Sequence, residues 1–278
     1  TTVTGLDHAD AIEELVTAPL GLPRLLGIAL DQQAGILDAV GIGEPPTPEE
    51  MEEAYGVKVD VTALIPPDVA LGALTSLNDP EARAVGVPGG GGIMRAADIA
   101  LLYQGLLRNT GSLWSEEALV EGTQRVRLML PDIWGVPASR TLGLVVSGAD
   151  GLGHRRGFGR TASPRAFGHN GAGGQLAFGD PDTGLSVGYL TAGLDQNMVR
   201  QARRDVAIAS LAADLLREAE TAGRLQHPDI VTIFDAGEAG ELAWIAMEYV
   251  RGADLQRHTA PGRLLPVPQA LEIVARVA

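Results

Sequence analysis

The clearest hydrophobic pattern of the chain lies between residues 166 and 195. Leu176–Phe178 and Leu185–Leu190 are compact apolar runs, and Phe167–Gly171 before them is a short run with a histidine at the head of a glycine cluster. The two apolar runs are separated by Gly-Asp-Pro-Asp-Thr-Gly at residues 179–184, a composition typical of turns. The pattern predicts a β-hairpin, preceded by a strand that ends in a histidine and a cluster of glycines.

Other parts of the chain have the spacing of helices. Apolar residues recur every three to four positions in the predicted helices, which are Asp7–Pro19, Ala96–Asn109, a short helix capped by Ser115, and Val199–Leu215. The apolar run Thr141–Ser147 predicts a further strand, and the segment His154–Arg156 after it predicts a solvated loop. Together these elements predict an α+β fold, in which an antiparallel sheet is flanked by helices.

Composition narrows the function classes. The 278 residues are 45% hydrophobic, enough to form the cores of one or two domains. A net charge of −14 disfavours nucleic acid and anionic membranes as partners. Without cysteine the chain has no disulfide, thiol nucleophile or zinc–thiolate site, and we expect no cofactor.

The start of the sequence adds expectations about location. It has neither a signal-peptide pattern nor an apolar run as long as a membrane span, which predicts a cytoplasmic location. The first residue is threonine, so we expect the sequence to begin inside a longer reading frame or after processing.

The candidate site lies at the head of the glycine cluster. The absence of side chains at Gly171, Gly173 and Gly174 would let a ligand or a neighbouring backbone come close to His169. A single histidine is also compatible with a purely structural role, and the residues alone leave both interpretations open.

A family resemblance favours the site. FGHNGAGGQLAFGDPDTGLSVGY resembles the last motif block of the serine β-lactamase-like family, which includes class C β-lactamases, penicillin-binding proteins and related esterases; His169-Asn170-Gly171 matches its His-x-Gly form. The resemblance implies part of a β-lactamase/transpeptidase-like fold and a small ester or β-lactam-like ligand. It implies that His169 helps to bind the substrate carboxyl or ester group and tunes the proton network. It also implies that Asn170 and Gly171 contact the substrate, and that the backbone near Gly174 and Gln175 forms part of an oxyanion hole.

The nucleophile of that family has no counterpart in this sequence. The family activates its serine with a lysine one helical turn later, S-x-x-K, but the single lysine here, Lys58, follows Tyr55 at that spacing. None of the four tyrosines begins a Tyr-x-Asn motif. Ser76-Leu77-Asn78 matches Ser-x-Asn, yet so short a match is common by chance. Ser186 lies in a G-x-S-x-G sequence, but the apolar run continues after it, so we expect a strand residue rather than a nucleophile elbow.

The last sixty residues resemble a different family. LLREAETAGRLQHPDIVTIFDAGEAGELAWIAMEYVRGADL resembles the N-terminal lobe of bacterial Ser/Thr protein kinases. The resemblance assigns Glu218 to the acid that pairs with the ATP-binding lysine, and Glu248 and Val250 to the adenine-contacting hinge. It also assigns two strands, Ile230–Asp235 and Leu242–Met247, joined by a turn at residues 236–240. The lysine itself, H-R-D and D-F-G are missing, so these positions are expected to be vestigial.

These observations predict two domains, a partial serine hydrolase over residues 1–215 and a partial kinase-like lobe over 216–278. The favoured hypothesis is a β-lactamase-related esterase or β-lactamase without its nucleophile half, inactive as this chain. The alternative is a non-catalytic remnant or interaction module with a kinase-like regulatory segment.

Overall fold

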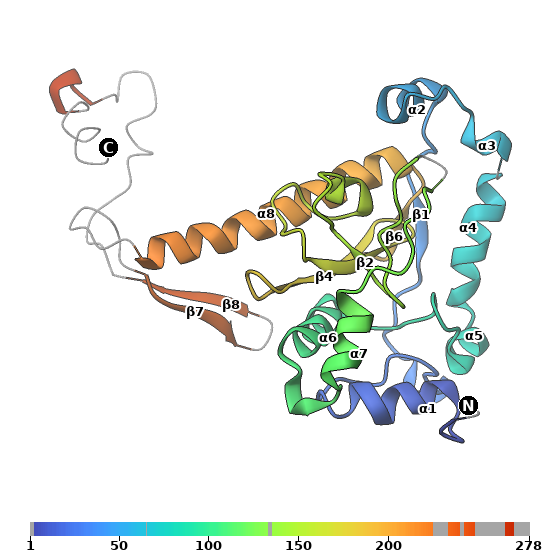
Figure 1. Cartoon of the computed structure of the whole chain (residues 1–278). Coiled ribbons are helices and arrows are strands. Elements are labelled where there is room, and N and C mark those ends of the chain that lie inside the picture. The colour runs from blue at the N-terminus through green and yellow to red at the C-terminus, as the bar shows by residue number, and fades with distance from the viewer. Residues whose placement is uncertain are drawn as a thin grey trace. The chain divides into compact units, whose positions relative to one another are not determined.

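A computed structural model of the chain describes residues 3–64, 66–132, 135–224, 233–239, 242–247 and 265–269. The chain divides into two compact units, Thr1–Asp214 and Leu215–Ala278 (Figure 1). The first unit contains the main sheet and the candidate site. The domain boundary drawn from the sequence stays a prediction.

A four-stranded antiparallel sheet organises the first unit. Its strands, in spatial order, are β2 (Val145–Val146), β3 (Phe167–Gly171), β4 (Gln175–Asp180) and β5 (Leu185–Tyr189). The predicted hairpin is confirmed as β4 and β5. Its turn begins at Pro181 rather than at Gly179, because Gly179 and Asp180 pair with Ser186 and Leu185 in the ladder. Ser186 is therefore a strand residue, as the sequence predicts.

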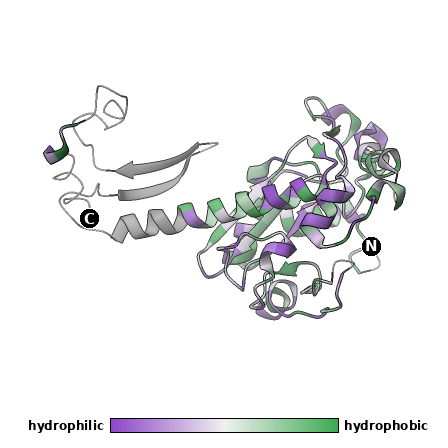
Figure 2. Ribbon diagram, turned by 90° about the horizontal axis from the view of Figure 1, so that it is seen from above, coloured by the Kyte–Doolittle hydropathy of each residue, from purple (hydrophilic) through white to green (hydrophobic). Residues whose placement is uncertain are grey.

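Helices cover both faces of this sheet. On one face α6 (Ala96–Arg108) contributes Tyr103 to a cluster with Phe167 and Ala177. On the other face α8 (Met198–Arg224) contributes Ala209. Figure 2 shows hydrophilic and hydrophobic positions alternating along α8, as expected for a helix with one face on a sheet. The predicted α+β fold with a helix-flanked antiparallel sheet is confirmed.

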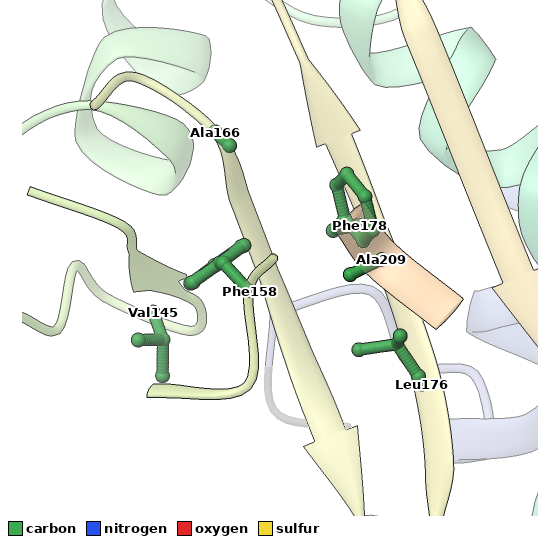
Figure 3. Packing of buried hydrophobic residues seen from close by; sticks show 6 residues of the cluster. All are labelled: Val145, Phe158, Ala166, Leu176, Phe178 and Ala209. Atoms are coloured by element: carbon green, nitrogen blue, oxygen red, sulfur yellow. The ribbon is translucent and has the colours of Figure 1, made fainter. Parts of the chain in front are cut away.

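The core on the α8 side is built around two aromatic rings. Phe158 and Phe178 have 1% and 0% of their surface exposed. Their ring centroids are 5.9 Å apart at an interplanar angle of 76°, an edge-to-face contact (Figure 3). The other members of the cluster are Val145 in β2, Ala166 directly before β3, Leu176 in β4 and Ala209 in α8. Residues 176 and 178 point to this face because side chains alternate along β4.

Capping residues set the starts of the predicted helices. Asp7 accepts a hydrogen bond from the backbone of Ala9 and begins α1 (His8–Ile12), which continues as a π-helical segment, η1 (Glu13–Thr17). Ser115 accepts from Ala118 at the start of α7 (Glu116–Thr123). The cap expected at Ser115 is confirmed, and Asp7, the first residue of the helix predicted over Asp7–Pro19, is a cap as well.

The segment between α1 and α6 consists of short elements. They are η2 (Leu30–Gln32), β1 (Val40–Ile42), α2 (Pro48–Tyr55), α3 (Val61–Leu64), α4 (Pro67–Thr75), η3 (Ser76–Asn78) and α5 (Pro80–Val85). The amide group of Asn78 donates to the backbone oxygen of Ala39 and accepts from its N–H, both at 2.8 Å. Asn78 of the Ser-x-Asn sequence therefore has a structural role, because its side chain fixes the backbone of the residue before β1.

β1 forms a parallel pair with β6 (Gly193–Asp195), which the sequence pattern does not reveal. Val40 is paired with Gly193 and Ile42 with Asp195. Three-residue strands so far apart in the chain carry too few positions to show a periodicity. This pair brings the chain before α2 next to the start of α8.

Two local expectations were wrong. The strand predicted over Thr141–Ser147 is reduced to Val145–Val146 in β2, because the hydroxyl of Thr141 accepts from the backbone N–H of Leu144 and holds a turn before the strand. The segment His154–Arg156 is not a fully solvated loop. It lies in η5 (Gly153–Arg156), and the Arg156 guanidinium is buried against Asp150 at 2.5 Å. A further short helix, η4 (Thr110–Ser112), follows α6.

The second unit contains an antiparallel pair, β7 (Ile233–Ala239) and β8 (Leu242–Met247). The predicted second strand is confirmed, but Ala236 to Ala239 belong to β7 rather than to a turn. Glu218 lies in α8, whereas Glu248 and Val250 lie outside the described residues. Among the described residues, no helix combines the length and apolar character that crossing a membrane requires.

Candidate functional site

His169 lies on the part of β3 that extends beyond β2. β2 pairs only with Phe167 and Gly168, so the strand edge is free of β2 from His169 onward. The imidazole is exposed, and its Nε2 lies 3.1 Å from Nη1 of Arg140. Its Nδ1 contacts the backbone oxygen of Asn170. Because a carbonyl only accepts and a guanidinium only donates, this geometry fits the tautomer with the proton on Nδ1.

The His-x-Gly residues do not share one face of the sheet. His169 pairs with Ala177, which packs on the α6 side, whereas Asn170 pairs with Leu176, which packs on the α8 side. The two side chains therefore point to opposite faces. The sequence motif assigns both residues to one site, but consecutive residues of a strand point to opposite faces of the sheet, so the two side chains lie apart.

An open cleft of about 980 Å³ lies beside the end of β3 on the α8 side. Asn170 and Gly171 line it, whereas His169 does not. Five arginines contribute to its walls: Arg140, Arg155, Arg156, Arg160 and Arg203. Such a concentration of guanidinium groups in an acidic chain favours anionic ligands.

Gly174 and Gln175 shape the turn that joins β3 to β4. Gly174 has a φ of +93°, and the Arg204 guanidinium fills the space beside it. The side-chain amide of Gln175 donates to the backbone oxygen of Thr191 at 2.7 Å and accepts from its N–H at 2.9 Å. In this structure both residues have structural roles, and their contribution to an oxyanion hole stays a prediction.

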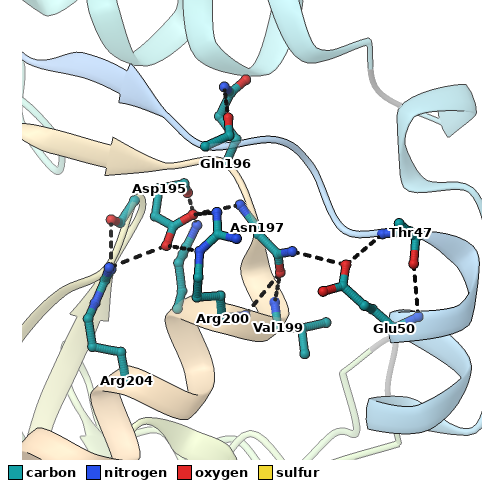
Figure 4. Close-up of polar contacts among 11 residues, drawn as sticks. Thr47, Glu50, Asp195, Gln196, Asn197, Val199, Arg200 and Arg204 are labelled. Carbon is teal, nitrogen blue, oxygen red and sulfur yellow. Dashed lines mark hydrogen bonds and ion pairs between the residues drawn. The ribbon is translucent and has the colours of Figure 1, made fainter.

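Asp195, which the sequence analysis missed, is the centre of the polar network behind this turn. Its carboxylate accepts from Arg200 at 2.6 Å and from Arg204 at 3.3 Å (Figure 4). Arg204 also donates to the backbone oxygen of Gly173 at 3.3 Å. Although burial opposes ionisation, the hydrogen bonds from Arg200 and the backbone of Asn197 lower the pKa of Asp195.

Asp205 is a second residue that the sequence analysis missed. It lies in α8, is buried and lines the cleft. Burial raises its pKa to about 6, against the opposing effect of Arg204. The only sequence signal for Asp205 is the charged run from Arg203 to Asp205, which is typical of a solvated helix face. Among the described residues, no group of three or more histidine, aspartate or glutamate side chains is placed to hold a metal ion.

Comparison with known proteins decides the family. The model of the Beta-lactamase family matches residues 2–212. The chain belongs to the β-lactamase family. This β-lactamase-family chain has a fold similar to EstA from Arthrobacter nitroguajacolicus Rue61a, with a TM-score of 0.52 and 21% identity over 77% of the chain and 56% of EstA. A penicillin-binding protein homologue from Caulobacter crescentus has a TM-score of 0.51 and 22% identity, over 73% of this chain and 52% of that one.

Curated relatives come from the other family suggested by the sequence. The β-lactamase-family chain is 44% identical over 86 residues to the serine/threonine-protein kinase PknB of Mycobacterium leprae, which is 26% of this chain and 14% of PknB. It is 47% identical over 64 residues to PknI of Mycobacterium bovis, which is 22% of this chain and 11% of PknI. The predicted similarity to bacterial protein kinases is confirmed, and it covers a small part of their length.

Proposed function

We propose that this chain carries the His-x-Gly part of a serine hydrolase site of the esterase or β-lactamase type. The observation that supports the proposal is the position of His169, which is exposed on β3 beyond β2 and bonded to Arg140. From there an imidazole can donate to or accept from a substrate carboxyl or ester group. The ligand would be a small ester or a β-lactam-like molecule, held also by Asn170 and Gly171.

We further propose that the 278-residue chain hydrolyses neither ligand by itself. S-x-x-K and Tyr-x-Asn do not occur in the sequence. In this chemistry the serine forms the covalent intermediate and the lysine takes its proton, so the rest of the site cannot replace them. Ser186 pairs with Gly179 in the ladder, a geometry unlike the strand-to-helix turn of a nucleophile elbow.

The test measures hydrolysis and labelling together. The chain is incubated with a chromogenic cephalosporin and with a short-chain nitrophenyl ester, and separately with a fluorophosphonate label. We expect no hydrolysis above background and no labelled serine. Stoichiometric labelling that disappears in Ser186→Ala or Ser76→Ala would contradict the inactive assignment and identify the nucleophile.

Ligand binding by His169 is tested separately. Saturation transfer between the chain and the intact nitrophenyl ester should weaken in His169→Ala. It should remain in Ser186→Ala, because Ser186 lies in β5 and is separated from β3 by β4. Equal binding by both variants would exclude His169 from the site.

The similarity to protein kinases supports a second candidate, a non-catalytic regulatory segment. Adenine-nucleotide binding, measured by calorimetry with ATP and magnesium, would favour it. The kinase-like segment lacks the ATP-binding lysine, since the chain's single lysine is Lys58, so we expect no ATP binding.

A further inference from the structure

The wall of the 980 Å³ cleft contains a carboxylate oxygen that no described group satisfies. Asp205 lines this cleft with only 3% of its surface exposed. Within the described residues, no donor lies within hydrogen-bonding distance of its Oδ1. Buried carboxylates in folded proteins are normally paired or hydrogen-bonded. Asp205 is therefore an acceptor that is ready for a ligand.

Arg204, the residue before Asp205, does not donate a hydrogen bond to its carboxylate. Nη1 of Arg204 is directed to Asp195 at 3.3 Å, and Nη2 donates to the backbone oxygen of Gly173 at 3.3 Å. Arg204 thus acts on Asp205 through its charge alone. Within the described part of the chain, the Nε of Arg204 is also buried without a partner, yet it does not bond Asp205, so the cleft is the remaining source of a donor.

Two guanidinium groups elsewhere in the cleft are available for an anion. Arg155 and Arg160 are exposed and line the cleft, and within the described ranges neither guanidinium has a hydrogen-bond or ion-pair partner. Arg140 and Arg203 differ, since they contact His169 and Glu53. In a chain with a net charge of −14, exposed arginines gathered in one cleft attract anions to it.

We propose that the cleft binds a small zwitterion of the amino-acid or short-peptide class, whose ammonium donates to Asp205 and whose carboxylate is bound by Arg155 and Arg160. A simple anion would leave Asp205 without a donor, and a simple cation would be repelled by the arginines. The volume lies at the upper end of the range for small-molecule sites, so a tripeptide fits better than a single amino acid. The inference goes beyond the proposed hydrolase site. Asn170 and Gly171 line the same cleft, but Asp205, Arg155 and Arg160 have no part in that site, and His169 does not line the cleft.

The test uses three forms of one peptide with the full chain, measured by calorimetry: trialanine, N-acetyl-trialanine and trialanine amide. Trialanine should bind most tightly, and removing either terminal charge should weaken binding by roughly ten- to a hundredfold. Asp205→Asn should abolish the preference for the free amine. Arg155→Met combined with Arg160→Met should abolish the preference for the free carboxylate. Asp214→Asn, on the same helix but outside the cleft lining, is the matched control and should bind as the unchanged chain does.

The pH dependence provides a second readout. Asp205 ionises with a pKa of about 6, so the affinity for trialanine should rise between pH 5 and pH 7, while that for N-acetyl-trialanine should not. Arg204 and Asp195 act on the charge of Asp205. The other charged or titratable groups that line the cleft are Tyr55, Asp132, Arg140, His154, Arg155, Arg156, Arg160 and Arg203. His154 also lines the cleft, and His154→Asn should keep the rise.

Three outcomes overturn the proposal: no binding of trialanine at millimolar concentration, equal binding of the free and acetylated peptides, or unchanged selectivity in folded Asp205→Asn. His169→Ala should bind trialanine normally. Since no hydrolysis is measured, failure of this proposal and failure of the hydrolase proposal are distinguishable.

Discussion

The guanidinium of Arg204 occupies the space in which a side chain on Gly174 would begin. Gly174 has a φ of +93°, a conformation that side chains strongly disfavour. The same guanidinium holds the Asp195 carboxylate at 3.3 Å. The turn after the His-x-Gly strand is thus packed directly against the charge network of α8.

Gly174→Ala should therefore destabilise the chain beyond the cost of backbone strain. The control is Gly151→Ala, since Gly151 has a φ of +76° but open space around its Cα. We expect about 1 kcal/mol for the control and about 1 to 2 kcal/mol more at Gly174, measured by urea unfolding. An equal loss of stability in Gly174→Ala and Gly151→Ala would show that the Arg204 side chain moves away from residue 174 without an energetic cost.

Asp195→Asn should remove the acceptor that both Arg200 and Arg204 share. Arg200 is half exposed, which reduces the value of that pair, so we expect a loss of about 2 to 3 kcal/mol at pH 7. Asp182→Asn breaks the exposed pair with Arg165 and should cost less than about 1 kcal/mol.

The contribution of Asp195 also depends on pH. Its pKa is lower in the folded chain than in the unfolded chain, so on acidification the unfolded form takes up a proton first. The stabilisation is present above the usual carboxyl range and is lost as the pH falls through the folded pKa. Unfolding curves of Asp195→Asn should lack this acid-side loss, and an unchanged pH profile would contradict the assignment.

Asp205→Asn should have the opposite effect. Its pKa is raised to about 6, so the folded form holds its proton longer, and stability falls as the pH rises from about 4 to 6. At pH 7 the variant should be more stable than the unchanged chain, by on the order of 1 to 3 kcal/mol. Thermal unfolding at pH 4, 5, 6 and 7 tests this, with Asp214→Asn as control. A destabilised variant at pH 7 would mean that Asp205 is already satisfied.

Phe178→Ala should be the most costly change in the core. The side chain is fully buried and packs edge-to-face on Phe158. We expect a loss of about 3 to 5 kcal/mol in urea unfolding, from lost burial and the cavity left behind. Leu142→Ala, 73% exposed, should change stability by less than about 0.5 kcal/mol. A similar loss in both variants would contradict the assigned core.

The sequence predicts those elements whose signal is local. The caps at Asp7 and Ser115, the helix from Ala96 and the hairpin after Gln175 depend on neighbouring residues, and the structure contains each of them. The β1–β6 pair depends on residues far apart, and neither of its three-residue strands carries a pattern of its own.

The site shows the same division. The motif identifies His169 and Asn170, but only their partners in β4 show that they face opposite sides of the sheet. Asp195 and Asp205 are ordinary acidic residues in the sequence. The fold buries both carboxyl groups. Burial raises the pKa of Asp205, whereas hydrogen bonds from Arg200 and the backbone of Asn197 lower the pKa of Asp195 despite its burial.

The pairing of Val40–Ile42 with Gly193–Asp195 has a consequence for the order of folding. Asn197 and Arg203 strengthen the same connection through Glu50 and Glu53 in α2. During synthesis β1 and α2 leave the ribosome long before any of these partners exists. Closing so long a loop is slow, because its entropy is lost before the contacts form. The contacts that join β1 and α2 to the rest of the unit through β6 and α8 can therefore form only after the polypeptide beyond residue 195 has emerged.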